Sequence, residues 1–242
     1  MSGASRPAVS LRGISRRFGW TWALRRVDLA VNRGVTLALV GPNGAGKTTL
    51  LKVLATLLRP TEGEGEVLGF PLRGGGDEIR ARTGLLTGFG YLYGDLTAAE
   101  NLRFAARMAG GSPDARSADA VLERVGLGGV ADRRVRAFST GMRKRLALAQ
   151  LLLRPLDLVL LDEPYAGLDS EGVCLVDEMV REFRDGGATV VIASHQEGEA
   201  MRTAECRVAL AQGKIVDQER GGEAAGHHRT AGPPATSGGA GA

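Results

Sequence analysis

The sequence predicts an α/β fold with a mainly parallel sheet, an antiparallel β subdomain at its N-terminal end and a helical insertion. Three observations support this prediction. Apolar runs at 35–40, 158–161 and 189–193 alternate with helical patterns, and continuous apolar strands are typical of parallel sheets buried on both faces. Residues 8–34 instead alternate apolar and polar positions. Helical periodicity from about 97 to 153 then interrupts the strand-helix order.

The composition is that of a globular protein with a full core, with 242 residues of which 43% are hydrophobic. Runs of about 18 apolar residues, which membrane helices need, are absent, and the start lacks a secretory signal's apolar core. Any link to a membrane is therefore expected to run through a partner. The net charge of +4 is too even a balance to indicate nucleic-acid binding. Cys174 and Cys206 are expected to be buried, reduced thiols.

Residues 8–34 predict two strands around the aromatic turn 18–22. An aromatic side chain just before a nucleotide loop is suited to stack on a base. Packing within the hairpin is an equally good interpretation of Phe18, Trp20 and Trp22.

The segment 41–49 follows an apolar run and precedes a helical pattern. Its sequence GPNGAGKTT matches the phosphate-binding pattern GxxxxGK[ST] in a strand-turn-helix context, which predicts a P-loop NTPase core. Its glycines let backbone N–H groups surround phosphate oxygens, and the helix that starts near Gly46 presents its positive dipole end to them. Lys47 is expected to reach the terminal phosphates, and Thr48 to offer a hydroxyl to Mg²⁺. The expected nucleotide contacts are Asn43, Gly44, Ala45, Gly46, Lys47, Thr48 and Thr49.

Between this loop and the helical block the pattern is less regular. A helix over 50–58 is expected to end before Pro60, since proline disfavours helix in the preceding residue. Residues 64–72 are expected to form a strand and 73–77 a flexible loop. A further strand runs into a glycine-rich segment over 84–94.

The helical insertion is expected over about 97–153. Thr97 and Glu100 have the spacing of a capping box, and further helical runs cover 115–125 and 143–153.

The turn 138–142 precedes the last of these helices and places Ser139 to cap it. Free N–H groups at such a start bind phosphate as well, although capping alone is the simpler interpretation of an isolated turn.

Two carboxylates follow the apolar run 158–161. Because ligands of parallel sheets gather at the carboxyl ends of strands, Asp162 is suited to hold Mg²⁺ and Glu163 to orient or deprotonate an attacking water. Helix capping is the alternative for both acids. Asp169 is placed to cap a helix that continues through Val180.

The strand 189–193 delivers His195 at its carboxyl end, where a ring N–H would reach a terminal phosphate. A lone histidine is more often structural, and that alternative stays open. Two short strands are expected over 206–217. The low-complexity segment 218–242 is expected to be a disordered tail.

These motifs occur in a fixed order, and as an ensemble they make residues 8–217 resemble an ABC-transporter ATP-binding subunit. The resemblance implies one ABC ATPase domain that binds ATP and Mg²⁺ and powers transport by hydrolysis. It implies that Phe18 stacks on adenine, that Glu163 is the catalytic base and that His195 is the switch histidine. The motifs are the phosphate loop, Ser139-Thr140-Gly141-Met142, Leu160-Leu161-Asp162-Glu163-Pro164, Gly167-Leu168-Asp169 and Ser194-His195.

The resemblance also implies two partners. The family's signature segment, here 138–142, acts on the ATP of a second ATPase subunit in a head-to-tail dimer. Ser139, Gly141 and Asp169 are accordingly expected to be nucleotide-binding residues. The other implied partner is an integral membrane permease, which would hold the chain at the cytoplasmic face of the cell membrane.

Two departures from the family pattern concern turnover. Thr140 and Met142 replace a glycine and a glutamine of the usual signature, while Ser139 and Gly141 are kept. The position of the family's loop glutamine is matched by Phe89, whose ring offers no carbonyl oxygen to Mg²⁺ or water. The turnover rate is left open, and a degenerate subunit that only binds ATP is an alternative.

Segments 54–60, 91–97 and 167–172 look like the haem-exporter ATPase of cytochrome c maturation. Similar segments occur in ATPases of drug, polysaccharide and lipid exporters. A soluble ABC ATPase without a membrane partner is a rival from another class, but such proteins usually carry paired cassettes or coiled-coil insertions.

Overall fold

A six-stranded sheet forms the centre of the protein in a computed structural model that describes residues 6–88, 90–110 and 115–219. Its strand order is β10-β9-β3-β8-β7-β6. Neighbours are parallel except β9 and β10. The strands are β3 (Thr36–Val40), β6 (Thr83–Thr87), β7 (Leu158–Asp162), β8 (Thr189–Ser194), β9 (Cys206–Ala211) and β10 (Lys214–Glu219).

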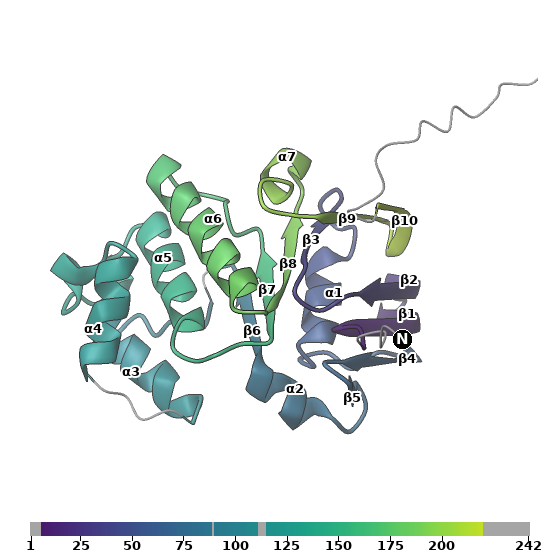
Figure 1. Ribbon diagram of the computed structural model, residues 1–242, viewed down its shortest axis with the longest axis horizontal. Coiled ribbons are helices and arrows are strands. Elements are labelled where there is room, and N and C mark those ends of the chain that lie inside the picture. The colour runs from purple at the N-terminus through teal and green to yellow at the C-terminus, as the bar shows by residue number, and fades with distance from the viewer. Residues whose placement is uncertain (1–5, 89, 111–114, 220–242) are drawn as a thin grey trace, which may run out of the picture.

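A second sheet of four antiparallel strands lies at one end of the molecule, in the order β2-β1-β4-β5 (Figure 1). Its strands are β1 (Val9–Phe18), β2 (Thr21–Val31), β4 (Glu62–Val67) and β5 (Phe70–Pro71).

Helices cover the central sheet and form the opposite end of the molecule (Figure 1). The α-helices are α1 (Lys47–Leu54), α2 (Gly76–Arg82), α3 (Ala98–Met108), α4 (Ala115–Arg124), α5 (Thr140–Leu151), α6 (Ser170–Asp185) and α7 (Glu197–Ala200). Two short 3₁₀ helices, η1 (Gly128–Val130) and η2 (Val135–Ala137), lie between α4 and α5. The capping box at α3 is present, because Thr97 Oγ1 accepts from the Glu100 N–H and the Glu100 carboxylate accepts from the Thr97 N–H.

Three apolar clusters hold these layers together. One joins the antiparallel sheet, α1 and one face of the central sheet. A second packs α5 and α6 against the other face, and a third forms the core of the helical insertion. Strands β3, β7 and β8 are buried along their whole length, as their continuous apolar sequences predict. The predicted fold class, with its three parts, is confirmed.

Local predictions between 50 and 77 need correction. Helix α1 ends at Leu54 rather than at 58, and Thr56 has a left-handed φ of 57° that a helix does not allow. The single strand expected over 64–72 is a hairpin, in which Leu68 and Gly69 reverse the chain. Part of the expected loop at 73–77 belongs to α2, which begins at Gly76.

Two further predictions also change. Cys174 is exposed and Cys206 is half-buried, because apolar neighbours in the sequence do not decide which side of α6 or β9 a residue occupies. Strand β10 pairs with β9 through Glu219, two residues past the expected domain boundary. Residues 220–242 of the predicted tail lie outside the described residues, as does Phe89.

Candidate nucleotide-binding site

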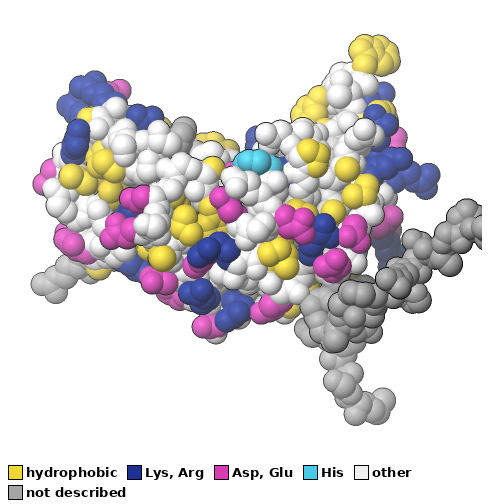
Figure 2. Space-filling view, turned by 90° about the horizontal axis from the view of Figure 1, so that it is seen from above, with side chains coloured by type: hydrophobic (Ala, Val, Ile, Leu, Met, Phe, Trp, Pro, Cys, Tyr) yellow, Lys and Arg dark blue, Asp and Glu magenta, His cyan; other side chains and the backbone are white. Residues whose placement is uncertain are grey.

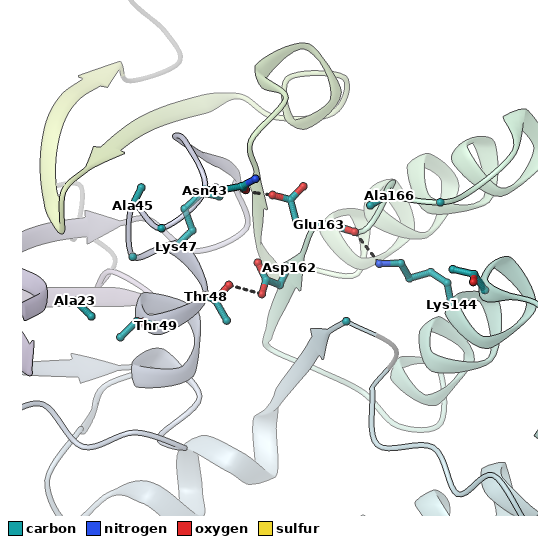
Figure 3. A pocket seen from close by; sticks show the side chains of 15 residues that line it. Ala23, Asn43, Ala45, Lys47, Thr48, Thr49, Lys144, Asp162, Glu163 and Ala166 are labelled. Atoms are coloured by element: carbon teal, nitrogen blue, oxygen red, sulfur yellow. Dashed lines mark hydrogen bonds and ion pairs between the residues drawn. The ribbon is translucent and has the colours of Figure 1, made fainter. Parts of the chain in front are cut away.

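A cavity of about 610 Å³ lies beside the phosphate loop. The loop and the start of α1 form one wall, the carboxyl end of β7 forms another, and α5 approaches from the opposite side (Figure 3). Parallel strands bring these segments together, since β3 and β7 flank β8 and end at the same edge of the sheet. The lining residues are Ala23, Asn43, Gly44, Ala45, Gly46, Lys47, Thr48, Thr49, Gly88, Thr140, Lys144, Asp162, Glu163, Ala166 and Gly167.

Two glycines of the phosphate loop are required by close packing. A Cβ on Gly41 would lie 2.1 Å from the Leu210 carbonyl oxygen, and one on Gly46 would lie 2.5 Å from that of Ala23. Gly46 also has a φ of 108°, which disfavours L side chains. The loop is thereby fixed against β2 and β9, with the start of α1 facing the cavity.

Lys47 is buried and folds back over the loop. Its Nζ donates to the carbonyl oxygens of Gly41 at 2.7 Å and Pro42 at 3.2 Å. The same ammonium lies 3.8 Å from Glu163 Oε1. It therefore brings positive charge to the middle of the cavity.

Thr48 and Asp162 meet across the cavity floor. The Thr48 hydroxyl donates to Asp162 Oδ2 at 2.7 Å (Figure 3). Asp162 Oδ1 is buried and lacks a hydrogen-bond partner among the described residues. Burial raises the pKa of Asp162, and the hydrogen bond from Thr48 opposes that shift. The pair offers oxygen ligands to a hard cation, and one of those oxygens is unpartnered.

Glu163 is held by the end of β8. Its carboxylate accepts from the His195 N–H at 2.9 Å and from the Ser194 hydroxyl at 3.2 Å. The His195 ring nitrogen Nδ1 lies 3.0 Å from Glu163 Oε2, and the histidine side chain reaches the surface (Figure 2). Glu163 itself has a φ of 50°, and its N–H donates to the Ala193 carbonyl at 2.8 Å. The structure thus brings Glu163 and His195 into direct contact.

Lys144 is a site residue that the sequence analysis missed. It lies on α5 with 4% of its surface exposed, and its Nζ donates to the Glu163 main-chain oxygen at 2.7 Å (Figure 3). Burial lowers its pKa, against the attraction of Asp162 and Glu163. A signal was present in the sequence, because Thr140 and Lys144 are four residues apart and therefore share one face of the helix.

Ser139 and Gly141 of the signature segment lie away from the phosphate loop of the same chain, although Thr140 between them lines the first cavity. Ser139 and Gly141 line a second cavity, of about 430 Å³, together with Asp169. The Ser139 hydroxyl caps α5 by accepting from the Met142 N–H at 3.2 Å. The structure therefore does not join these residues to the first cavity.

Asp169 caps α6 by accepting from the Gly172 N–H at 2.8 Å, and Arg145 donates to it at 2.9 Å. These bonds lower the pKa of Asp169. Its N-cap role agrees with the sequence, although α6 continues beyond Val180 to Asp185.

Phe18 is 47% exposed at the end of β1. Among the described residues, it is not part of the first cavity's lining. The Arg16 guanidinium lies 4.7 Å from its ring centroid, and Trp20 at the hairpin tip is 94% exposed.

A phosphate loop between a buried strand and a helix, with acidic residues at the end of a nearby parallel strand, defines a P-loop nucleoside triphosphatase. A model of the family described as "ABC transporter" matches residues 24–166. The chain belongs to the ABC transporter family and is an ATPase subunit of that family.

Curated relatives include ATP-binding proteins that are named for different processes. The chain is 40% identical over 188 residues to the cytochrome c biogenesis ATP-binding export protein CcmA 2 of Cupriavidus metallidurans, covering 78% of this chain and 89% of that protein. It is 38% identical over 211 residues to the daunorubicin resistance ATP-binding protein DrrA3 of Streptomyces coeruleorubidus, covering 86% and 67%. It is 36% identical over 196 residues to the Nod factor export ATP-binding protein I of Cupriavidus pinatubonensis, covering 80% and 60%.

Solved structures have the same fold. One is a dimeric ATP-binding cassette, MJ0796, in a post-hydrolysis state bound to ADP and Pi, with a TM-score of 0.79, 26% identity and coverage of 88% of this chain and 98% of that chain. Another is an ATP-binding subunit of an ABC transporter, with a TM-score of 0.79, 28% identity and coverage of 88% and 90%. Over the described ranges, none of the helices is long and apolar enough to cross a membrane.

Proposed function

We propose that this chain hydrolyses Mg-ATP in a head-to-tail ATPase dimer and thereby powers an integral membrane exporter, with haem for cytochrome c maturation as the cargo. The observation that carries the catalytic part is the Glu163 carboxylate, which His195 and Ser194 hold beside the Lys47 ammonium.

The residues present fit a magnesium ion. Mg²⁺ takes few protein oxygens and keeps several waters. Asp162 offers a buried Oδ1 to which the described part of the chain gives no hydrogen-bond partner, and Thr48 offers a hydroxyl beside it. When bound, the ion neutralises charge that develops on the phosphate oxygens.

The chain's own residues supply positioning and a base. Backbone N–H groups at the start of α1 surround the phosphates, and Lys47 turns from the loop carbonyls toward the terminal phosphate. Glu163 accepts a proton from the attacking water, and His195 fixes the direction of that carboxylate. Little covalent chemistry is required of the protein, since alignment and charge stabilisation contribute most of the acceleration.

The adenine is proposed to stack on Phe18, whose ring is partly exposed beside the hairpin. Arg16 covers one face of that ring. The face opposite Arg16 is therefore the one that would receive the base.

The nucleotide site is completed by a second chain. Ser139, Gly141 and Asp169 lie at a separate cavity, so in our proposal they contact the ATP held by a partner's phosphate loop. The dimeric state of the solved cassette MJ0796 supports this arrangement. The permease binds the dimer at the cytoplasmic face of the membrane.

The cargo assignment rests on the relative named for cytochrome c biogenesis, which is matched over most of its length. The drug-resistance and Nod factor relatives are longer than this chain and are matched over about two thirds or less of their length. Purification of the chain with its membrane subunit, followed by haem transport into vesicles, tests the cargo. Transport of a drug or lipid in place of haem would refute it.

The catalytic proposal is tested with Glu163→Gln. Loss of a general base typically costs about 10²- to 10⁴-fold in turnover, while ATP binding and dimerisation should persist. Glu178→Gln, an exposed position on α6, is the matched control. Turnover close to wild type in Glu163→Gln would remove Glu163 from this role.

A further inference from the structure

Lys144 is a buried cation to which the reaction proposed above assigns no role. Burying an ammonium is costly unless hydrogen bonds compensate. At 4% exposure, Lys144 meets that condition through the Glu163 carbonyl oxygen, at 2.7 Å. The four lysines of the chain are Lys47, Lys52, Lys144 and Lys214, and two of them line the first cavity, from opposite sides (Figure 3).

The contact falls on a strained part of the backbone. Glu163 is a non-glycine residue with a φ of 50°, a conformation that persists only where surrounding contacts impose it. Three hydrogen bonds hold its main chain. Its N–H donates to the Ala193 oxygen at 2.8 Å, and its carbonyl accepts from Lys144 at 2.7 Å and, at a longer 3.3 Å, from the Ala166 N–H. The direction of the Glu163 carboxylate therefore depends on these neighbours, and Lys144 makes the shorter of the two bonds to the carbonyl.

Helix α5 connects this contact to the second cavity. The helix is capped by Ser139, which lines the second cavity, and Lys144 lies five residues further along. Thr140, in the turn between them, lines the first cavity. One short rigid helix thus touches both cavities.

We propose that Lys144 is a positioning residue of the ATPase reaction, which fixes the main chain of Glu163 and makes its geometry depend on the placement of α5. The proposal rests on the role proposed above for Glu163. When the start of α5 contacts a nucleotide that the partner holds, the resulting change in the position of α5 would then reach Glu163 of the same chain through Lys144. Lys144 acts through Glu163 and does not contact the phosphates.

The first test is Lys144→Met, which keeps the side-chain length and removes the donor. A shift of reacting groups by about 1 Å can cost about 10²-fold in rate, so kcat should fall about that far while the Kd for a fluorescent ATP analogue stays unchanged. Lys144→Arg retains N–H donors and should recover much of the rate. Lys214→Met, at an exposed position on β10, is the control. Thermal unfolding of each variant shows whether it is folded.

The second test combines Lys144→Met with Glu163→Gln. Since Lys144 acts through Glu163, the double variant should turn over no more slowly than Glu163→Gln alone. Losses that multiply in the double variant would overturn the proposal. A raised Kd for the ATP analogue in folded Lys144→Met would also overturn it, in favour of direct phosphate contact.

Failure of the proposed ATPase function and failure of the positioning role of Lys144 give different results. A wild-type protein without turnover contradicts the proposed function. An active wild-type protein with a sensitive Glu163, in which folded Lys144→Met is equally active, contradicts the role of Lys144 alone.

Discussion

The His195 ring nitrogen Nδ1 lies 3.0 Å from Oε2 of Glu163, and the two side chains come from the ends of neighbouring parallel strands. Removing the ring in His195→Ala leaves the carboxylate with fewer constraints. We expect kcat to fall about 10²-fold through misplacement of the base, with ATP affinity largely kept. Steady-state kinetics and equilibrium nucleotide binding measure the two effects.

Ser194→Ala removes a weaker contact with the Glu163 carboxylate, and its turnover can be compared with that of His195→Ala. The Ser194 hydroxyl makes a longer bond, of 3.2 Å, to the same carboxylate, and the two His195 contacts remain when it is removed. A smaller loss of rate than in His195→Ala is expected. Wild-type turnover in His195→Ala would contradict the contact's importance.

Asp162→Asn should stabilise the nucleotide-free protein while it impairs magnesium-dependent turnover. Burial raises the pKa of Asp162 above 3.8. An acid with a raised pKa in the folded state destabilises that state at pH values above the pKa, and the cost disappears as the pH falls through it. Asp162→Asn should therefore have a larger free energy of unfolding than wild type at pH 7. Urea unfolding at several pH values measures it.

The sign of the pH dependence is the critical outcome. The stability difference between Asp162→Asn and wild type should shrink as the pH falls toward 4, roughly the ordinary carboxyl pKa. A difference that grows on acidification would contradict a raised pKa. The predicted effect on catalysis is contradicted if ATP turnover by Asp162→Asn depends on magnesium concentration as turnover by wild type does.

Tyr165→Phe should destabilise the fold with little effect on nucleotide affinity. The Tyr165 hydroxyl donates to buried Asp177 at 2.9 Å, and Arg202 donates to the other carboxylate oxygen, also at 2.9 Å. Burial, and then the contact with Asp177, raises the pKa of the phenol, so the hydroxyl stays a donor at neutral pH. A buried acceptor that loses a partner costs about 1–3 kcal/mol. Urea unfolding measures the loss.

Tyr93→Phe serves as the matched control, since Tyr93 is 50% exposed and its hydroxyl can bond to water. A free energy of unfolding that falls equally in both variants would mean that the buried contact adds nothing.

Gly46→Ala should be far more damaging than Gly44→Ala, although both glycines belong to the phosphate loop. Both have positive φ, but a Cβ on Gly46 would lie 2.5 Å from the Ala23 oxygen, whereas one on Gly44 would meet no atom of the described residues within 4 Å. The left-handed conformation alone costs about 1–2 kcal/mol, which is the expectation for Gly44→Ala. Thermal unfolding compares the two, and equal losses would contradict the importance of the contact.

Much of the fold follows from the sequence because its signals are local. The continuous apolar runs before Asp162 and His195 are recognisable as buried strands, and the phosphate loop has a fixed spacing. The capping box at Thr97 likewise depends on residues three positions apart. Helix α2 was missed since the three consecutive glycines at 74–76, the last of which begins the helix, indicate a loop.

The residue types at the site were determined by the sequence alone: a loop that surrounds phosphate, two acids after a strand, and a histidine after another. Only the tertiary structure decided that Lys144 holds the Glu163 main chain, that Glu163 adopts a left-handed φ, and that Ser139 lies at a separate cavity. The physical reason is that these are contacts between segments far apart in the chain. Their geometry is set by how α5 packs against the sheet, which no local pattern records.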